Sequence, residues 1–330
     1  MRIAFFSTQP YDKLYFEANN QNTSIQFFYF DVSLTLQTVN LSSGFDGICI
    51  FVNDKVDATV IAALKENGVK FIALRCAGFN NVDINAAQAA TIKVYRVPAY
   101  SPQAVAEHAV ALILTLNRKT HKAYNRVREG NFSLDKLTGF NLFEKTVGVI
   151  GTGKIGIAFC KIMLGFGCKV IAYDVNESDY LKSVGVEYVT LENLFANADI
   201  VSLHCPLTPQ TKHIINEVAI KAMKPHVMLI NTSRGGLLHT KDTIAALKKG
   251  KIAYLGIDVY EQEQDLFFKD LSEQLILDDD ISRLLSFPNV LITAHQAFLT
   301  HEALTQIAQT TINNIQQFEA GNATVNEINL

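Results

Sequence analysis

The hydrophobic and polar positions of this chain follow two patterns that replace one another along almost its whole length. Short runs of β-branched and aromatic residues are separated by stretches in which apolar residues recur every third or fourth position. The first pattern is typical of buried strands, and the second is typical of amphipathic helices that cover a sheet. Their alternation predicts an α/β fold with parallel sheets.

The first hundred residues predict a small doubly wound unit. A helix is expected over residues 56–68, ending at Gly68, because a glycine just beyond a helix accepts the left-handed conformation found there. The strands of this unit are expected at 2–6, 25–30, 47–51 and 70–75.

One long helix is expected to follow, beginning at Ser101 and running to about residue 130. Ser101 suits the N-cap position, and Pro102 suits the first helical position. The apolar residues after them keep a helical spacing up to residue 116. We expect this helix to connect two domains.

The alternation starts again after a loop rich in Gly and Phe at residues 138–143. The last thirty residues predict one helix and a short tail. No Pro/Gly linker separates the two halves, so the chain is expected to cross between its domains near residues 100 and 297. The strands of the second half are expected at 146–150, 169–173, 199–204, 227–231, 254–258 and 289–293.

The composition fits two globular domains of ordinary size, with 330 residues of which 48% are hydrophobic and 18% are charged. The net charge is -3, and basic residues are scattered, which disfavours a nucleic-acid partner. The N-terminus has one basic residue and a short apolar run before Pro10, which indicates a first strand and not a signal peptide. The apolar stretch at 109–116 is too short to span a bilayer. We expect a soluble, cytoplasmic protein with no membrane partner.

The five cysteines indicate neither a disulfide framework nor a metal site, because their number is odd and no two of them form a CxxC pair. Cys160, Cys168 and Cys205 lie among apolar residues and are interpreted as small buried hydrophobes. No metal cofactor is therefore expected.

A glycine-rich turn with the spacing GxGxxG follows the expected strand at 146–150 and opens a helical pattern. Gly151 permits a tight turn, Gly153 lets the backbone approach a pyrophosphate, and Gly156 allows close packing of the helix. The free N–H groups of a helix N-terminus, here at Lys154 and Ile155, favour an anion. This context predicts a dinucleotide site.

Asp174 ends the next expected strand, 18 residues beyond Gly156. A carboxylate at this separation accepts hydrogen bonds from ribose hydroxyl groups. It would also repel a 2′-phosphate, so the sequence predicts NAD as the cofactor and not NADP.

Three further polar residues follow strands of the second half, where the ligand side of an open α/β sheet is expected. Arg234 lies in a turn, NTSRGG, and can clamp a substrate carboxylate through two parallel hydrogen bonds. His295 can exchange a proton with a carbonyl oxygen as a hydride arrives or leaves, and Glu263 can hold the imidazole and favour its protonated form. Taken alone, each residue also fits a purely structural role. Their joint placement after three strands of one sheet favours a catalytic set.

These motifs resemble those of the D-isomer-specific 2-hydroxyacid dehydrogenases, and within them the fermentative NAD-dependent D-lactate dehydrogenases. The resemblance covers essentially the whole chain, and HQAFLT with DLFF at 265–268 indicates the D-lactate branch. Many relatives have Pro where this chain has Ala294, and some D-lactate enzymes have Tyr where it has Phe298 or Leu299. The motifs are RCAGFNNVD (75–83), VPAYSPQAVAEH (97–108), GVIGTGKIG (148–156), HCPLTPQT (204–211), NTSRGG (231–236), GIDVYEQE (256–263) and ITAHQAFLT (292–300).

The resemblance implies a role for each matching position. Arg234, Glu263 and His295 would be the catalytic residues. The Ala77–Gly78 backbone would receive the substrate carboxylate, and Tyr100 and Phe298 would contact the substrate. The residues that would line the cofactor, beside the glycine-rich turn and Asp174, are Cys205, Pro206, Thr211, Thr232, Ser233 and Asp258, with Asp258 near the nicotinamide amide.

The resemblance also implies the architecture. It predicts two doubly wound domains with a cleft between them: a flavodoxin-like substrate domain formed by 1–100 and 298–330, and an NAD-binding Rossmann domain formed by 101–297. The helix from Ser101 would help to form a homodimer, and a homotetramer is an alternative.

The implied reaction is the reversible reduction of pyruvate to D-lactate by NADH. Phe51, Phe79, Tyr100 and Phe298 are candidates for the wall of a small apolar pocket. Two alternatives stay open. One is a related dehydrogenase acting on larger 2-oxo acids, glycerate or phosphoglycerate, and the other is a non-catalytic NAD(H)-sensing protein like the dehydrogenase-related corepressors.

Overall fold

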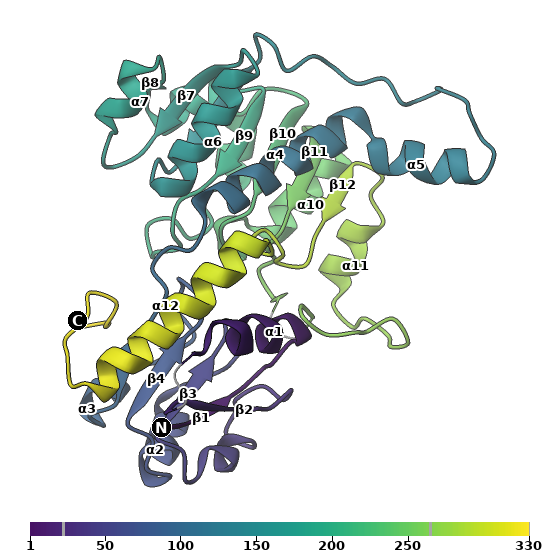
Figure 1. The fold of residues 1–330 in the computed structure, drawn as a ribbon. Coiled ribbons are helices and arrows are strands. Elements are labelled where there is room, and N and C mark those ends of the chain that lie inside the picture. Colours follow the sequence, from purple (N-terminus) through teal and green to yellow (C-terminus); the bar gives the residue numbers. More distant parts are fainter. Residues whose placement is uncertain (22–23, 264–265, 330) are drawn as a thin grey trace. The chain divides into compact units, whose positions relative to one another are not determined.

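The computed structural model describes residues 1–21, 24–263 and 266–329. The chain divides into two compact units, of which the first consists of Met1–Ser101 with Leu299–Leu330 and the second of Pro102–Phe298. Each unit contains one parallel sheet (Figure 1). Within the described residues, no helix combines the length and the apolarity that a membrane span requires.

The first unit has a five-stranded sheet with the order β2-β1-β3-β4-β5, and all its strand pairs are parallel. This is the flavodoxin-like order, in which the ligand edge is formed by the carboxyl ends of the strands. The strands are short apolar runs, and β3 and β4 are completely buried. The strands are β1 (Arg2–Phe5), β2 (Gln26–Tyr29), β3 (Gly47–Ile50), β4 (Phe71–Leu74) and β5 (Lys93–Tyr95).

Two helices of the first unit begin at clear capping residues. Asp57 and Asp83 each accept backbone N–H groups at the starts of their helices. Gly68 follows the second helix with a φ of +85°, as expected for a C′ glycine. The last helix contacts both the first helix and β4. The helices are α1 (Pro10–Asn19), η1 (Val39–Ser42), α2 (Ala58–Glu66), α3 (Ile84–Ala89) and α12 (His301–Glu319).

The second unit has a seven-stranded parallel sheet with the order β12-β11-β10-β9-β6-β7-β8. Counted within the unit, this is the Rossmann order, and the topological switch point lies between β6 and β9. The strands are β6 (Thr146–Ile150), β7 (Lys169–Tyr173), β8 (Glu187–Tyr188), β9 (Ile200–Leu203), β10 (Val227–Asn231), β11 (Ile252–Ile257) and β12 (Val290–Ile292).

Helices cover both faces of this second sheet. One core contains apolar residues of α4 and α6, and the other contains those of α8 to α11. The sheet is therefore buried on both faces, which explains its nearly continuous apolar strands. The helices are α4 (Pro102–Arg118), α5 (Thr120–Arg128), α6 (Lys154–Gly165), α7 (Asp179–Ser183), α8 (Leu191–Asn197), α9 (Glu217–Ala222), η2 (Gly235–Leu237), α10 (Thr240–Lys248) and α11 (Asp279–Leu285).

The predicted fold class, two doubly wound parallel sheets, is confirmed, but the single long helix from Ser101 is wrong. It is divided at Lys119, which has a left-handed φ of 52° and separates α4 from α5. The apolar face of α4 is buried, whereas α5 has no buried residue. Packing therefore stabilises only the first of the two helices.

Candidate active site

The glycine-rich turn lies at the topological switch point of the second sheet. Gly151 follows β6 with a φ of +96°, and a Cβ there would lie 2.5 Å from the backbone nitrogen of Cys205, just beyond β9. A Cβ at Gly156 would collide with the carbonyl group of Gly151. At Gly153 a Cβ would meet nothing within 4 Å, so the N-terminus of α6 is open where a pyrophosphate is expected. The turn fits a dinucleotide.

Asp174 is held beside this turn at the carboxyl end of β7. Its Oδ2 accepts hydrogen bonds from the backbone nitrogen of Thr152, at 2.5 Å, and from its hydroxyl group, at 3.2 Å. The Tyr188 hydroxyl donates to the Thr152 hydroxyl at 2.9 Å. The predicted ribose-binding carboxylate is therefore tied to the predicted pyrophosphate turn.

The other cofactor candidates gather on the segments after β9 and β10. The Ser233 hydroxyl donates to the Cys205 carbonyl at 2.7 Å, and the Thr211 hydroxyl donates to the Pro206 carbonyl at 2.6 Å. Burial raises the pKa of the Cys205 thiol to about 11, so it is an unreactive packing group. The buried hydroxyl of Thr232 has no hydrogen-bond partner among the described residues, as expected of a group that faces a ligand.

Arg234 is half-buried in the turn after β10. Its Nη1 donates to the Ser233 carbonyl at 2.7 Å, and Asn231 Nδ2 donates to the Arg234 carbonyl at 2.8 Å. The next residue, Gly235, packs so closely against the backbone of Tyr260 and Glu261 that a Cβ would collide with it. The turn carrying Arg234 is thus fitted against the segment that leads to Glu263.

His295 and Glu263 form a direct pair, with 2.9 Å between Nδ1 and Oε1. The backbone nitrogen of Tyr260 donates to the other carboxylate oxygen of Glu263 at 2.9 Å. His295 has a left-handed φ of 52°, and its backbone nitrogen donates to the Asp258 carbonyl at 2.7 Å. Within the part of the chain that the structure describes, Nε2 has no hydrogen-bond partner and is left for an external proton acceptor or donor, which is the arrangement that general acid–base catalysis requires.

Asp258 anchors the segment that carries His295. Its carboxylate is completely buried and accepts hydrogen bonds from the Thr293 hydroxyl at 2.5 Å and the backbone nitrogens of Gln296 and Ala297 at 2.8 Å each. Burial raises the pKa of Asp258, but the hydrogen bonds from His108 and Thr293 outweigh it and hold that pKa below its usual value. An ionised Asp258 therefore fixes the backbone next to the imidazole of His295.

The substrate candidates fall in both units, and each is described within its own. In the first unit, Ala77 and Gly78 follow β4, and the Ala77 carbonyl accepts a hydrogen bond from Arg96 at 3.3 Å. Tyr100 is half-buried near the end of that unit's first segment. In the second unit, Phe298 is buried.

Two of the four aromatic pocket candidates pack against arginine side chains. The ring of Phe51 lies 4.9 Å from the guanidinium of the buried Arg75, and the ring of Phe79 lies 5.2 Å from that of Arg96. Phe51 is buried, as expected of a core aromatic residue.

Comparison with known proteins identifies the family. Residues 110–297 match the family model described as D-isomer specific 2-hydroxyacid dehydrogenase, NAD binding domain. The chain is 52% identical over 328 residues to the D-lactate dehydrogenase of Escherichia coli (strain K12), a match that covers 99% of this chain and 100% of that protein. The chain belongs to the D-isomer-specific 2-hydroxyacid dehydrogenases.

Solved structures of similar dehydrogenases share the fold. The apo-structure of D-lactate dehydrogenase from Escherichia coli has a TM-score of 0.91 at 49% identity, with full coverage of both chains. The NAD-complexed D-isomer specific 2-hydroxyacid dehydrogenase from Lactobacillus delbrueckii ssp. bulgaricus has a TM-score of 0.80 at 32% identity, also with 100% coverage of both chains. The family and the NAD cofactor expected from the motifs are confirmed. The first residue of the DLFF motif, Asp265, lies outside the described residues.

Three polar residues for which the sequence indicates no specific role, His108, His213 and Glu261, support the candidate site of this dehydrogenase. His108 Nε2 lies 3.0 Å from the Thr293 hydroxyl and 3.5 Å from Asp258 Oδ1. His213 Nε2 lies 2.6 Å from Glu261 Oε1. His108 and Glu261 lie inside the motifs VPAYSPQAVAEH and GIDVYEQE, which was the available signal, but only the tertiary structure brings their partners to them.

Glu261 and His213 join the segments that carry the dehydrogenase's candidate residues. The other carboxylate oxygen of Glu261 accepts from the Thr240 hydroxyl at 2.8 Å. Burial raises the pKa of Glu261, but the hydrogen bonds from His213 and Thr240 lower it by more. The pKa of this carboxyl therefore lies below its usual value. The backbone nitrogen of His213 donates to the Gly236 carbonyl at 2.8 Å, which ties the segment after β9 to the turn of Arg234.

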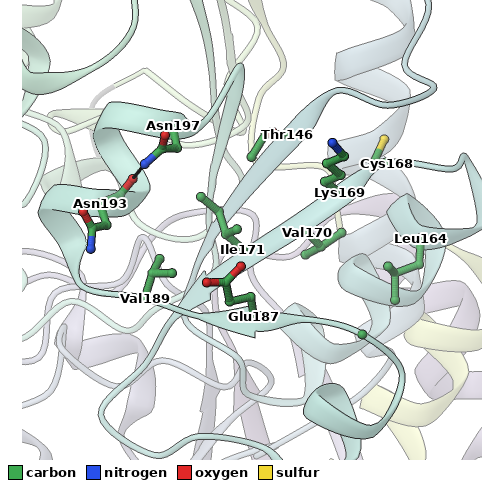
Figure 2. A pocket seen from close by; sticks show the side chains of 11 residues that line it. Thr146, Leu164, Cys168, Lys169, Val170, Ile171, Glu187, Val189, Asn193 and Asn197 are labelled. Carbon is green, nitrogen blue, oxygen red and sulfur yellow. Dashed lines mark hydrogen bonds between the residues drawn. The ribbon is translucent and has the colours of Figure 1, made fainter.

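A hollow of about 660 Å³ in the second unit lies away from the cofactor turn (Figure 2). Its lining includes Thr146, Lys169 and Glu187, which begin β6, β7 and β8. Gly151 and Asp174 follow the opposite ends of β6 and β7. The hollow is therefore at the amino ends of the strands, and it is not the ligand side of this sheet.

Proposed function

We propose that this protein is an NAD-dependent D-lactate dehydrogenase that reduces pyruvate to D-lactate reversibly. The observation that carries the proposal is the His295–Glu263 pair, 2.9 Å apart, on the same sheet as a dinucleotide turn. The full-length identity of 52% to a D-lactate dehydrogenase favours this substrate over others of the family.

The chain's own residues perform binding and proton transfer. Arg234 clamps the carboxylate of pyruvate and polarises the neighbouring carbonyl group, and the Ala77–Gly78 backbone receives the same carboxylate. Protonated His295 donates its Nε2 proton to the carbonyl oxygen, while Glu263 holds Nδ1 and stabilises the imidazolium. When bound, NADH supplies the hydride that C2 accepts. The reaction balances as pyruvate + NADH + H⁺ giving D-lactate + NAD⁺.

The residues proposed to hold the cofactor fit a dinucleotide in the order of its parts. The turn at Gly151, Gly153 and Gly156, with the N-terminal residues Lys154 and Ile155 of α6, would hold the pyrophosphate. Asp174 would accept the ribose hydroxyls. Cys205, Pro206, Thr211, Thr232, Ser233 and Asp258 would line the rest of the cofactor.

Each unit has its own task in this proposal. The proposed NAD-binding domain is residues 101–297 and the proposed substrate domain is residues 1–100 with 298–330, so each boundary lies one residue from that of the two units. Phe79, Tyr100 and Phe298 would contribute to a small apolar pocket. One methylene group changes binding in such a pocket by about 1–3 kcal/mol, so slightly larger 2-oxo acids should also be reduced, more slowly.

A steady-state assay of NADH oxidation against a panel of 2-oxo acids tests the activity. The expected result is the highest kcat/KM with pyruvate and D-lactate as the product, as determined with a stereospecific assay. A clear preference for a longer 2-oxo acid or for a phosphorylated substrate would replace pyruvate with that substrate. Tight NADH binding without turnover of any member would favour an NAD(H) sensor.

We further propose that the protein works as a homodimer in the cytoplasm. The helix α5 and the loop after it extend from the second unit's sheet (Figure 1), and they expose apolar side chains: Tyr124 (61%), Val127 (49%), Phe132 (73%) and Leu134 (81%). Large apolar side chains exposed on one helix and the loop that follows it are typical of a subunit interface. The five cysteines are all buried free thiols, which suits a reducing compartment. Sedimentation velocity should show a dimer, and replacing Phe132 and Leu134 with Ser should shift it to a monomer.

A further inference from the structure

In the turn after β4, three consecutive carbonyl groups are each paired with a donor of the first unit. The Cys76 carbonyl accepts from the backbone nitrogen of Val97 at 3.1 Å. The Ala77 carbonyl accepts from Arg96 Nη1 at 3.3 Å, and the Gly78 carbonyl accepts from the Cys76 thiol at 3.3 Å. Cys76 and Ala77 are thus held from their carbonyl side by the segment that follows β5, and Gly78 is held from within the turn.

These hydrogen bonds also determine where the backbone N–H groups point. A trans peptide bond is planar, so the C=O of one residue and the N–H of the next point in opposite directions. The bond from Val97 to the Cys76 carbonyl therefore orients the Ala77 N–H, and the bond from Arg96 to the Ala77 carbonyl orients the Gly78 N–H. Both N–H groups point away from the segment after β5.

Arg96 is itself fixed on several sides. Its backbone nitrogen donates to the Asn326 carbonyl at 3.1 Å, and its carbonyl accepts from Asn314 Nδ2, on α12, at 3.0 Å. Asn326 and Asn314 are joined to each other at 2.9 Å. The guanidinium lies over the ring of Phe79 at 5.2 Å from its centroid. A half-buried side chain held in this way keeps its charge beside the turn.

We propose that Arg96 is a positioning residue for the substrate carboxylate. This inference rests on the proposed function, in which the Ala77 and Gly78 N–H groups receive that carboxylate. The Arg96 hydrogen bond presents the Gly78 N–H to the anion, and the guanidinium charge makes the turn more attractive to it. Arg96 acts through the turn, in contrast to Arg234, which contacts the carboxylate itself.

Two substitutions separate the contributions of hydrogen bond and charge. Arg96→Met removes both the hydrogen bond and the charge. We expect the KM for pyruvate to rise about tenfold, because this is the order of the attraction between two unit charges near a protein surface. The change in kcat should be smaller. Arg96→Lys keeps the charge but not the planar guanidinium, so it should recover part of the loss. The dissociation constant of NADH should stay within twofold of wild type, because NADH binds the second unit.

A control variant tests whether position or net charge matters. Lys70 immediately precedes β4, at the end opposite the turn, and its side chain is 64% exposed beside Asp46. Lys70→Met removes the same charge and should leave the KM for pyruvate unchanged. An equal rise of KM in this variant would overturn the proposal, as would an Arg96→Met enzyme whose KM stays within twofold of wild type.

The wild-type reaction keeps the two proposals apart. If the wild type reduces pyruvate and the Arg96→Met variant has the same KM for pyruvate, the role of Arg96 is contradicted and the proposed function stands. If the wild type reduced no 2-oxo acid at all, the proposed function would fail and the role of Arg96 with it. Loss of NADH binding in Arg96→Met would show a general structural role and would also contradict the proposal.

Discussion

At the scale of single residues, the arrangement of Arg234 can be tested by a substitution that keeps its charge. Arg234→Lys should lower kcat/KM for pyruvate by about 10²-fold or more, because an ammonium group cannot make two parallel hydrogen bonds to a carboxylate. Steady-state kinetics check this, with Arg283→Lys on the exposed face of α11 as the control. Turnover close to that of wild type would remove Arg234 from the catalytic set.

Glu263 offers a second test at this scale, because its carboxylate touches His295. Glu263→Gln should lower kcat by about 10²-fold, since a neutral amide stabilises the imidazolium less. For the same reason, pyruvate reduction should require a lower pH than in wild type. A pH–rate profile measures both effects, and Glu273→Gln at an exposed position is the matched control. An unchanged profile would count against the pairing.

The sequence could predict Arg234, Glu263 and His295 as a set because each follows a strand of one parallel sheet, and the carboxyl ends of such strands meet at one edge. It could not identify His108 or His213 as supports. Their partners lie far away in the sequence, and a histidine on a helix or in a loop has many structural uses. The sequence does not show which residues far apart along the chain become hydrogen-bond partners.

At the scale of elements, the strand–turn–helix unit from β6 to α6 depends on its glycines. Gly156→Ala should weaken NADH binding by at least about tenfold, because the new Cβ would collide with the Gly151 carbonyl and displace the turn that holds the pyrophosphate. Titration of NADH fluorescence measures the affinity. Gly165→Ala, where a Cβ meets nothing within 4 Å, is the control. Equal affinities in the two variants would contradict the role of this turn.

Strands marked by a continuous apolar run could be predicted from the sequence, and elements without such a mark could not. Buried strands such as β6, β7 and β10 have the predicted bounds, because continuous apolar runs mark them. The edge strands β5 and β8 were not predicted, since their short sequences, KVY and EY, contain no such run. The division of α4 from α5 also had no clear signal, because Lys119 adopts a left-handed conformation without being Gly or Asn.

At the scale of the whole molecule, the first unit is built from two segments of the chain, one before and one after the second unit in the sequence. Residues 299–330 return to the first unit, where α12 contacts β4 and the tail pairs with β5 through Tyr95 and Glu327. This returning segment holds Arg96 in place through hydrogen bonds with Asn314 and Asn326. The chain's last residues are thus part of the support for a turn near residue 77.

The stability of the second unit should depend on pH through His204. Burial lowers the pKa of His204 to about 3, its Nε2 lies 2.9 Å from the Ser202 hydroxyl, and its ring packs against Phe159. The unfolded chain binds the proton below about pH 6.5, whereas the folded unit does not. The stabilisation is therefore complete above pH 6.5 and is lost as the pH falls towards 3, by about 1.4 kcal/mol per pH unit.

Urea denaturation at several pH values between about pH 7 and pH 5 measures this loss of stability. Carboxylates with a lowered pKa, such as Asp258, take up protons only below these pH values and do not contribute. His204→Gln keeps a partner for Ser202 but cannot be protonated, so the slope of unfolding free energy against pH should fall by about one proton. His226→Asn is the control, since His226 is exposed at a left-handed position that Asn tolerates. If the slope in His204→Gln equals that of wild type, the His204 imidazole does not govern the stability of the protein between these pH values.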